Sequence, residues 1–217
     1  MRFNFSSFNY QQGAALEAED KAYLVDHVAL ARALPGLRVY LTGVYQGARG
    51  TRPAHYRAAF FGFDSAEASV AALQSPAGAK MRTHGAEHFA DVRLMAMDGE
   101  MIVPFEPRRI GQPCFVFAAE FDLKLRPGEE LAAAERRYLG YHTGVARRLP
   151  GLRCYVIGRL VDRGLKPDRL RAAMLVFDSV EAWRAAYRSP VGEELVKDEK
   201  ASIGNDRIHR LDATVQL

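Results

Sequence analysis

The chain has 217 residues, of which 48% are hydrophobic and 26% are charged, with a formal net charge of +4, as in ordinary globular proteins of one or two domains. No apolar run is long enough to cross a bilayer, and 26 acidic residues are interleaved with 30 basic ones, so we expect neither a membrane protein nor a nucleic-acid-binding stripe. The opening residues lack a signal peptide's apolar core and the two cysteines form no disulfide framework, which favours the cytoplasm.

In the first half, β-rich composition predicts a strand over residues 2–8. Apolar residues at helical spacing then predict a helix over roughly 16–34, which ends at Pro35–Gly36. Strands are expected near 37–45 and 56–63. Asp64 with Glu67 has capping-box spacing and predicts a helix start at Asp64. A further helical segment is expected from Ser75–Pro76, with a last strand near 91–103.

A connector rich in proline and glycine at 98–114 precedes the same series of elements. A strand is expected over 114–122, a helix over roughly 129–149, and strands near 152–161 and 170–177. Helical segments are then expected from Asp178 and from Ser189–Pro190, before a last strand near 206–216.

The two halves repeat each other in sequence. "LPGLRVYLTG" at 34–43 returns as "LPGLRCYVIG" at 149–158, and residues 23–43 match 138–158 at 12 of 21 positions. Residues 57–78 match 171–192 at 13 of 22 positions. We interpret this as a duplicated βαββαβ unit, the ferredoxin-like split motif. The predicted domains are a first repeat at 1–104, a linker at 105–112 and a second repeat at 113–217.

Apolar residues point to both faces of the predicted strands, as Leu37, Val39 and Leu41 do on one side and Tyr40 and Val44 on the other. A sheet covered on one face only would alternate apolar with polar residues. Helices cover one face, and we expect the sister sheet to cover the other. The predicted fold class is therefore α+β, with two tandem repeats whose antiparallel sheets pack into one α/β barrel.

The shared pattern is a tyrosine, a histidine four residues later, Leu-Pro-Gly-Leu-Arg-x-Tyr, Phe-Asp-Ser-x-Glu-Ala and Ser-Pro-x-Gly. It resembles the EthD family of the dimeric α/β-barrel superfamily, over most of both halves. This resemblance implies a barrel of the kind that family members form by dimerisation, here fused into one chain. The family's usual His-x-Pro-Leu reads "HVAL" at 27–30 and "HTGV" at 142–145, so its proline is missing from both repeats.

The candidate catalytic residues are the pairs Tyr23/His27 and Tyr138/His142. Tyrosine and histidine four residues apart are neighbours on a helix, and histidine in a partly apolar pocket can carry protons near neutral pH. The alternative interpretation is a buried histidine that helps the helix dock on the sheet. The sequence leaves both interpretations open.

Arg38 and Arg153 stand at matching strand starts, where they could hold a substrate carboxylate or, as we expect more strongly, form salt bridges at the barrel rim. Tyr40 and Tyr155 could stack on a flat ligand or simply pack in the core. "HGAEH" at 84–88 has the spacing of a zinc motif, but the second repeat lacks it, and no metal or other cofactor is predicted.

The resemblance implies an oxidoreductase-like or related enzyme, namely a cofactor-free monooxygenase, isomerase or cyclase acting on a hydrophobic or aromatic carbonyl compound. One alternative is a non-catalytic protein that binds such a molecule within a degradation or biosynthesis pathway. Another is a haem-binding tandem barrel. The expected partner is a hydrophobic small molecule, and association into a homodimer stays open.

Overall fold

The computed structural model describes the chain apart from residues 14, 48–52, 107–108 and 162–168, so part of the predicted linker lies outside the described residues. The chain divides into two compact units. Unit 1 comprises Met1–Asp98, Pro107–Gln112 and Ala213–Leu217, and unit 2 comprises Gly99–Glu106 and Pro113–Asp212. Each unit thus includes a short strand end from the other half of the sequence. The domain boundaries at 104 and 113 stay predictions.

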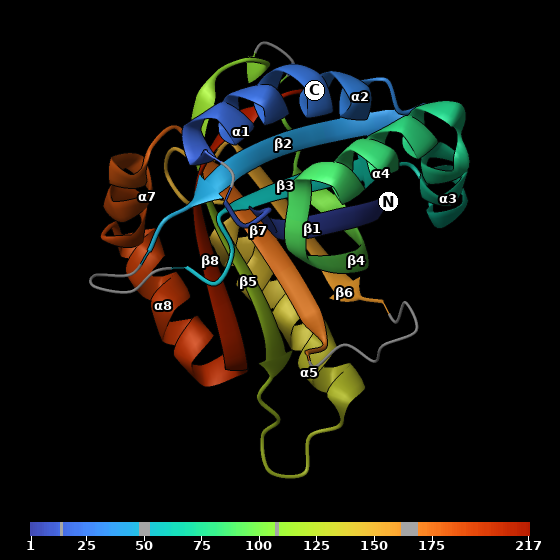
Figure 1. Cartoon of the computed structure of the whole chain (residues 1–217). Coiled ribbons are helices and arrows are strands. Elements are labelled where there is room, and N and C mark those ends of the chain that lie inside the picture. The colour runs from blue at the N-terminus through green and yellow to red at the C-terminus, as the bar shows by residue number, and fades with distance from the viewer. Residues whose placement is uncertain (14, 48–52, 107–108, 162–168) are drawn as a thin grey trace. The chain divides into compact units, whose positions relative to one another are not determined.

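Unit 1 follows the βαββαβ order, with helices on one face of its sheet (Figure 1). Its elements are β1 (Arg2–Tyr10), α1 (Leu16–Ala22), a π-helical turn η1 (Tyr23–His27), α2 (Val28–Arg32), β2 (Leu37–Tyr45), β3 (Arg57–Phe63), α3 (Ala66–Gln74), α4 (Pro76–His88) and β4 (Phe89–Val103).

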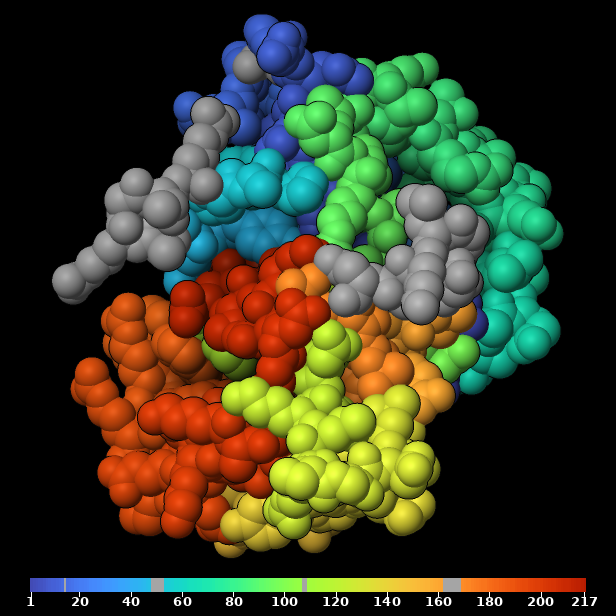
Figure 2. Space-filling model, turned by 90° about the horizontal axis from the view of Figure 1, so that it is seen from below, coloured from blue at the N-terminus to red at the C-terminus, as the bar shows by residue number. Residues whose placement is uncertain are grey.

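Unit 2 repeats this order. Its elements are β5 (Pro113–Leu123), α5 (Leu131–Arg137), a π-helical turn η3 (Tyr138–His142), α6 (Thr143–Ala146), β6 (Cys154–Leu160), β7 (Arg171–Phe177), α7 (Val180–Tyr187), α8 (Pro190–Ser202) and β8 (Ile203–Val215). The chain of unit 2 runs from yellow through orange to red on the surface that Figure 2 shows.

The strands form a closed barrel in the hydrogen-bonded order β1-β3-β2-β8-β5-β7-β6-β4. In each repeat the first strand pairs antiparallel with the third, as in Phe5 opposite Phe60 and Ala118 opposite Met174. All seven residues of β3 are buried, which agrees with cover on both faces of the sheet. The predicted fold class, two tandem ferredoxin-like repeats in one α/β barrel, is confirmed.

The first helix of each repeat is interrupted, whereas the sequence predicts a continuous one. The Val28 N–H bonds to the Tyr23 carbonyl, and the Thr143 N–H bonds to the Tyr138 carbonyl, so each turn carries one residue more than an α-helical turn. Both π-helical turns run from the tyrosine to the histidine of a candidate pair. A single extra residue is invisible to the apolar spacing, and this is why the prediction missed it.

The second helical region of each repeat begins one residue later than predicted. Ser65 and Ser179 cap α3 and α7 by accepting hydrogen bonds from the N–H groups of Ala68 and Ala182. The predicted caps at Asp64 and Asp178 are therefore wrong. Those carboxylates instead pair with arginines at the starts of the repeat's strands. The predicted Ser-Pro starts of α4 and α8 are confirmed, with Ser75 and Ser189 as caps.

Candidate functional site

Each π-helical turn stacks its tyrosine on its histidine. The ring centroids of Tyr23 and His27 lie 5.2 Å apart, those of Tyr138 and His142 lie 4.7 Å apart, and the interplanar angle is 18° in both. All four side chains are buried, the tyrosines to 1% exposure and the histidines to 5–6%. The spacing that singled out the two pairs in the sequence thus corresponds to direct contact within each unit.

In unit 1 the tyrosine hydroxyl is fully engaged. Tyr23 Oη lies 2.9 Å from Thr42 Oγ1 and 3.2 Å from Tyr40 Oη, and Thr42 in turn donates to the Ala58 carbonyl at 2.8 Å. The Arg57 guanidinium lies 4.8 Å from the centre of the Tyr23 ring. Because every polar group here has a partner, this network is what a buried structural tyrosine requires.

In unit 2 the matching hydroxyls have no such partners. Tyr138 and Tyr155 correspond to Tyr23 and Tyr40 at the repeat offset of 115, and Ile157 stands where unit 1 has Thr42. Both hydroxyls are buried, and neither has a hydrogen-bond partner of good geometry in the described part of the chain. Burial raises the pKa of Tyr138 to about 12, and the nearby Tyr155 hydroxyl opposes the rise. The two hydroxyls of unit 2 therefore lie near each other but lack the threonine partner that unit 1 has.

The two histidines differ in the partner of Nδ1. His142 Nδ1 lies 2.8 Å from Asp198 Oδ2, and Ser202 donates to the other carboxylate oxygen at 3.1 Å. The hydrogen bond from His142 is the main reason why the pKa of Asp198 is lowered. With its proton on Nδ1, His142 keeps a free lone pair on Nε2, as a carboxylate-oriented general base does.

His27 faces another imidazole instead. Its Nδ1 lies 3.2 Å from Nδ1 of His84, whose ring stacks on His88 at 4.3 Å. Burial, followed by the charges of His84 and His88, lowers the pKa of His27 to about 3. A histidine that resists protonation this strongly is a weak proton acceptor at neutral pH. The electrostatic setting of His27 therefore disfavours it as a proton carrier.

Arg38 and Arg153 lie away from the buried tyrosines. Arg38 is bound to Asp64 at 2.7 Å and Arg153 to Asp178 at 2.6 Å, at largely exposed positions. These ion pairs do not indicate a binding site, because ion pairs at protein surfaces are common and weak. Tyr40 and Tyr155, in contrast, lie next to the candidate pairs, as Tyr40 shows by its contact with Tyr23.

The structure adds residues of α7 and α8 that the sequence did not single out. Tyr187 donates to Glu199 Oε1 at 3.3 Å, and burial raises the pKa of Glu199 while the charge of His142 opposes the rise. Burial is the main cause that raises the pKa of Tyr155, and Tyr187 adds to the rise. The Tyr187 hydroxyl therefore lies near the hydroxyls of Tyr138 and Tyr155. The sequence indicates these two residues only by a difference between the repeats, because the first repeat has Leu73 and Gly85 where the second has Tyr187 and Glu199.

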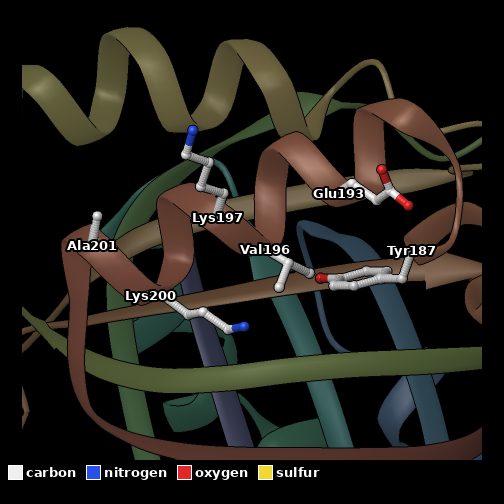
Figure 3. A pocket seen from close by; sticks show the side chains of 6 residues that line it. All are labelled: Tyr187, Glu193, Val196, Lys197, Lys200 and Ala201. Atoms are coloured by element: carbon white, nitrogen blue, oxygen red, sulfur yellow. The ribbon is translucent and has the colours of Figure 1, made fainter.

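Two depressions open on the described surface. One, of about 550 Å³, lies on unit 2 and is lined by Tyr187 and by residues of α8, namely Glu193, Val196, Lys197, Lys200 and Ala201 (Figure 3). The other, of about 480 Å³, lies between α2 and α4 of unit 1 and is lined by Asp26, Ala29, Leu30, Ala33, Pro76, Ala77 and Lys80. Tyr187 is the residue that connects the first depression to the polar cluster around Tyr138.

Within the described residues, no group of three or more histidine, cysteine, aspartate or glutamate side chains is placed to hold a metal ion. Likewise, none of the helices described has both the length and the apolar character needed to pass through a bilayer. Cys114 and Cys154 are buried in the core.

Comparison with known proteins places the fold. No protein-family model and no curated protein matches the sequence. A candidate monooxygenase from Fusobacterium nucleatum superposes with a TM-score of 0.72 at 9% identity, over 99% of this chain and 93% of that one. An anthrone oxidase-like protein superposes with a TM-score of 0.60 at 17% identity, over 99% and 93%. Both full-length likenesses support the tandem barrel.

An EthD family protein from Bacillus halodurans is also among the similar structures. It is 20% identical, covers 45% of this chain and 98% of its own length, and has a TM-score of 0.41.

Proposed function

We propose that the chain is a small-molecule enzyme that removes a proton next to the carbonyl group of a hydrophobic or aromatic compound, at the site around Tyr138 and His142. The enolate formed in this step is common to cofactor-free oxygenation, isomerisation and cyclisation. His142, oriented by Asp198, takes the proton at Nε2. The hydroxyls of Tyr138 and Tyr155 donate to the developing oxyanion.

The observation that carries this proposal is the pair of unpartnered hydroxyls in unit 2. Buried hydroxyls are nearly always hydrogen-bonded, and leaving one unpaired costs about 1–3 kcal/mol. In unit 1 the Tyr23 hydroxyl bonds to both Thr42 and Tyr40. Ile157 removes the threonine partner in unit 2, where neither tyrosine hydroxyl has a partner of good geometry among the described residues, so both can donate to a ligand's carbonyl oxygen.

The similar structures support the same class of chemistry. One is described as a candidate monooxygenase and another as anthrone oxidase-like. Anthrone itself is an aromatic ketone that reacts through its enolate: loss of the C10 proton and reaction with O₂ give anthraquinone and water, so that the substrate supplies all the electrons. A hydrophobic ligand and this reaction type are proposals for the present chain.

Proton removal can be tested without assuming the later step. Anthrone, 2-tetralone and 1-indanone are incubated with the protein in D₂O under argon, and deuterium exchange next to the carbonyl is followed by NMR. We expect exchange of at least one ketone about 10²–10⁴ times faster than with buffer alone. Tyr138→Phe should slow it roughly tenfold or more, because it removes an oxyanion donor. Exchange that no ketone shows above buffer would count against the enzyme and favour a binding protein.

A further inference from the structure

The depression on unit 2 has a polar and an aromatic side. In Figure 3 the ammonium group of Lys200 and the hydroxyl of Tyr187 point into the same space beneath α8, whereas Lys197 points to the other side of the helix. No carboxylate in the described part of the chain forms an ion pair with Lys200. The depression therefore offers an unneutralised cation beside a tyrosine hydroxyl, which suits an anionic oxygen.

Behind Tyr187 lies a buried carboxyl group. Glu199 Oε1 accepts the Tyr187 hydrogen bond at 3.3 Å. The charged and titratable groups that act on Glu199 are His142 from η3, Tyr187 from α7, its neighbour Asp198 and Asp206 from β8. Burial raises its pKa more than His142 and Tyr187 lower it. A carboxylate with a raised pKa accepts protons from weak acids more readily than an exposed one.

An aromatic surface adjoins Tyr187. Its ring lies 5.4 Å from that of Trp183, and Trp183 stacks on Phe117 with centroids 5.4 Å apart. The Trp183 indole N–H is buried and has no hydrogen-bond partner of good geometry within the described residues. Phe117 and the Arg210 guanidinium contact the Trp183 ring, so the Tyr187 ring is the aromatic surface that the depression offers to a planar aromatic ligand.

None of these features exists in unit 1. At the repeat offset of 114, the positions of Trp183, Tyr187, Glu199 and Lys200 are occupied by Ser69, Leu73, Gly85 and Ala86. Ser69 instead accepts a hydrogen bond from Asn4 at 2.7 Å. The two repeats share their fold, so four coordinated differences around one depression point to a role that the fold does not require.

We infer that this depression is the substrate entrance of the unit 2 site and selects a planar aromatic phenol or enol, with Lys200 holding the anionic oxygen and Glu199 accepting the proton. The inference rests on the proposed function and names its substrate class. The transfer runs through Tyr187 and is complete in itself: the ligand O–H bond breaks, its electron pair stays on the ligand oxygen, its proton binds Tyr187 Oη, and the Tyr187 proton forms the O–H bond of the Glu199 carboxylic acid.

4-Nitrophenol is a suitable probe, because its phenol and phenolate forms absorb at different wavelengths. Trp183 is the only tryptophan of the chain, so quenching of its fluorescence reports binding beside Tyr187 directly. Lys200→Met should weaken the affinity roughly tenfold. Lys80→Met, which changes a lysine of the unit 1 depression, is the matched control and should change the affinity less than about twofold. Glu199→Gln should still bind the probe but hold a smaller fraction as phenolate at the same pH, and melting temperatures check that each variant is folded.

Three results would overturn the inference: no quenching of Trp183 at millimolar probe, equal effects of the two lysine variants, or an unchanged phenolate fraction in Glu199→Gln. The deuterium-exchange assay separates this inference from the proposed function. If only the inference fails, exchange still depends on His142 while Lys200→Met and Glu199→Gln match the parent in every assay. If only the proposed function fails, no ketone exchanges but the probe results stand.

Discussion

Ile157 is the side chain that separates the two Tyr–His pairs most clearly. Its counterpart Thr42 hydrogen-bonds both the Tyr23 hydroxyl and the Ala58 carbonyl, so that unit 1 needs no ligand. With isoleucine at this position, the hydroxyls of Tyr138 and Tyr155 stay buried, and the residues that the structure describes give neither a hydrogen-bond partner of good geometry. A ligand oxygen that accepts hydrogen bonds from these hydroxyls would therefore gain free energy that unit 1 already obtains from Thr42.

This difference predicts unequal effects of the same substitution in the two repeats. Tyr23→Phe removes a hydroxyl with two hydrogen bonds and should lower the free energy of unfolding by about 1–2 kcal/mol. Tyr138→Phe removes a buried hydroxyl that has no partner of good geometry among the described residues, so it should leave the free energy of unfolding unchanged or raise it by up to about 1–3 kcal/mol. Urea unfolding of both variants measures the contrast. A cost for Tyr138→Phe as large as that for Tyr23→Phe would show that its hydroxyl is structurally engaged.

His27 predicts a specific loss of stability in acid. Its pKa of about 3 in the folded chain lies below the value near 6.5 expected after unfolding. The unfolded state therefore binds the proton more tightly, so the contribution of His27 is present above pH 6.5 and is lost as the pH falls towards 3. The largest slope is about 1.4 kcal/mol per pH unit.

His27→Gln should remove part of this slope. Its free energy of unfolding, compared with that of the parent at pH 7 and pH 4.5, should be less sensitive to acid by about 1–2 kcal/mol. His55→Gln serves as a control, because its imidazole bonds to the Asp91 carbonyl rather than to His27. Parallel curves for the parent and His27→Gln would show that His27 keeps an ordinary affinity for protons.

Much of the residue-level site could be predicted, and the rest could not. The tyrosine–histidine contact follows from a spacing of four residues. The Asp198 partner of His142 is 56 residues away and depends on how α8 packs against η3. The environment of the Tyr138 and Tyr155 hydroxyls depends on how η3 packs against β6. Only the repeat alignment, read with the structure, shows that Ile157 matters.

At the scale of elements, the π-helical turns bring the two rings of each pair into stacking contact. An α-helix would also bring residues four apart together, which is why the pairs were predictable although the turns were not. Such turns cost stability relative to an α-helix and are often found at functional sites. In this chain the turn occurs in both repeats, so it is a feature of the fold, and the partners around it decide what each pair does.

The glycines of unit 2 give an element-level prediction with a built-in contrast. A methyl group added at Gly144 meets nothing within 4 Å, so Gly144→Ala should raise the free energy of unfolding by about 0.5–1 kcal/mol, as in other helices. A methyl group at Gly192 would lie 2.3 Å from the Ala186 carbonyl oxygen. Gly192→Ala should therefore open the α7–α8 turn and destabilise the protein.

Thermal or urea unfolding of the two variants checks this contrast. The result also tests the meaning of the repeated Ser-Pro-x-Gly motif, whose glycine is needed because the backbone of the preceding helix lies against it. Equal stability changes for Gly144→Ala and Gly192→Ala would contradict the described turn.

At the scale of the whole molecule, the sequence repeat predicted the barrel. It did not predict that each unit includes a strand end from the other half of the sequence. The chain end at 213–217 belongs to unit 1, where Gln216 N–H donates to the Tyr40 carbonyl at 2.7 Å and Tyr40 N–H donates to the Leu217 carbonyl at 3.0 Å. Sequence patterns mark strands but not the neighbour with which a strand end pairs, since backbone hydrogen bonds are available to any edge.

Removing residues 213–217 should therefore weaken unit 1, although these residues follow unit 2 in the sequence. Three backbone hydrogen bonds to Tyr40 are lost, at about 1 kcal/mol each, and the edge of β2 becomes available for association. We expect a melting temperature lower by roughly 5–10 °C and a tendency to oligomerise, seen by calorimetry and light scattering. An unchanged melting temperature would show that this strand end contributes little.

We infer that the two repeats have diverged, so that His142 carries protons whereas His27 is structural. Ketone deuterium exchange and melting temperature, measured for His142→Asn and His27→Asn, test this divergence. We expect His142→Asn to reduce exchange by about 10²–10⁴ with nearly normal melting. We expect His27→Asn to leave exchange within about threefold of the parent. Near-normal exchange in His142→Asn would show that His142 is not the proton carrier, whatever the melting temperature of that variant.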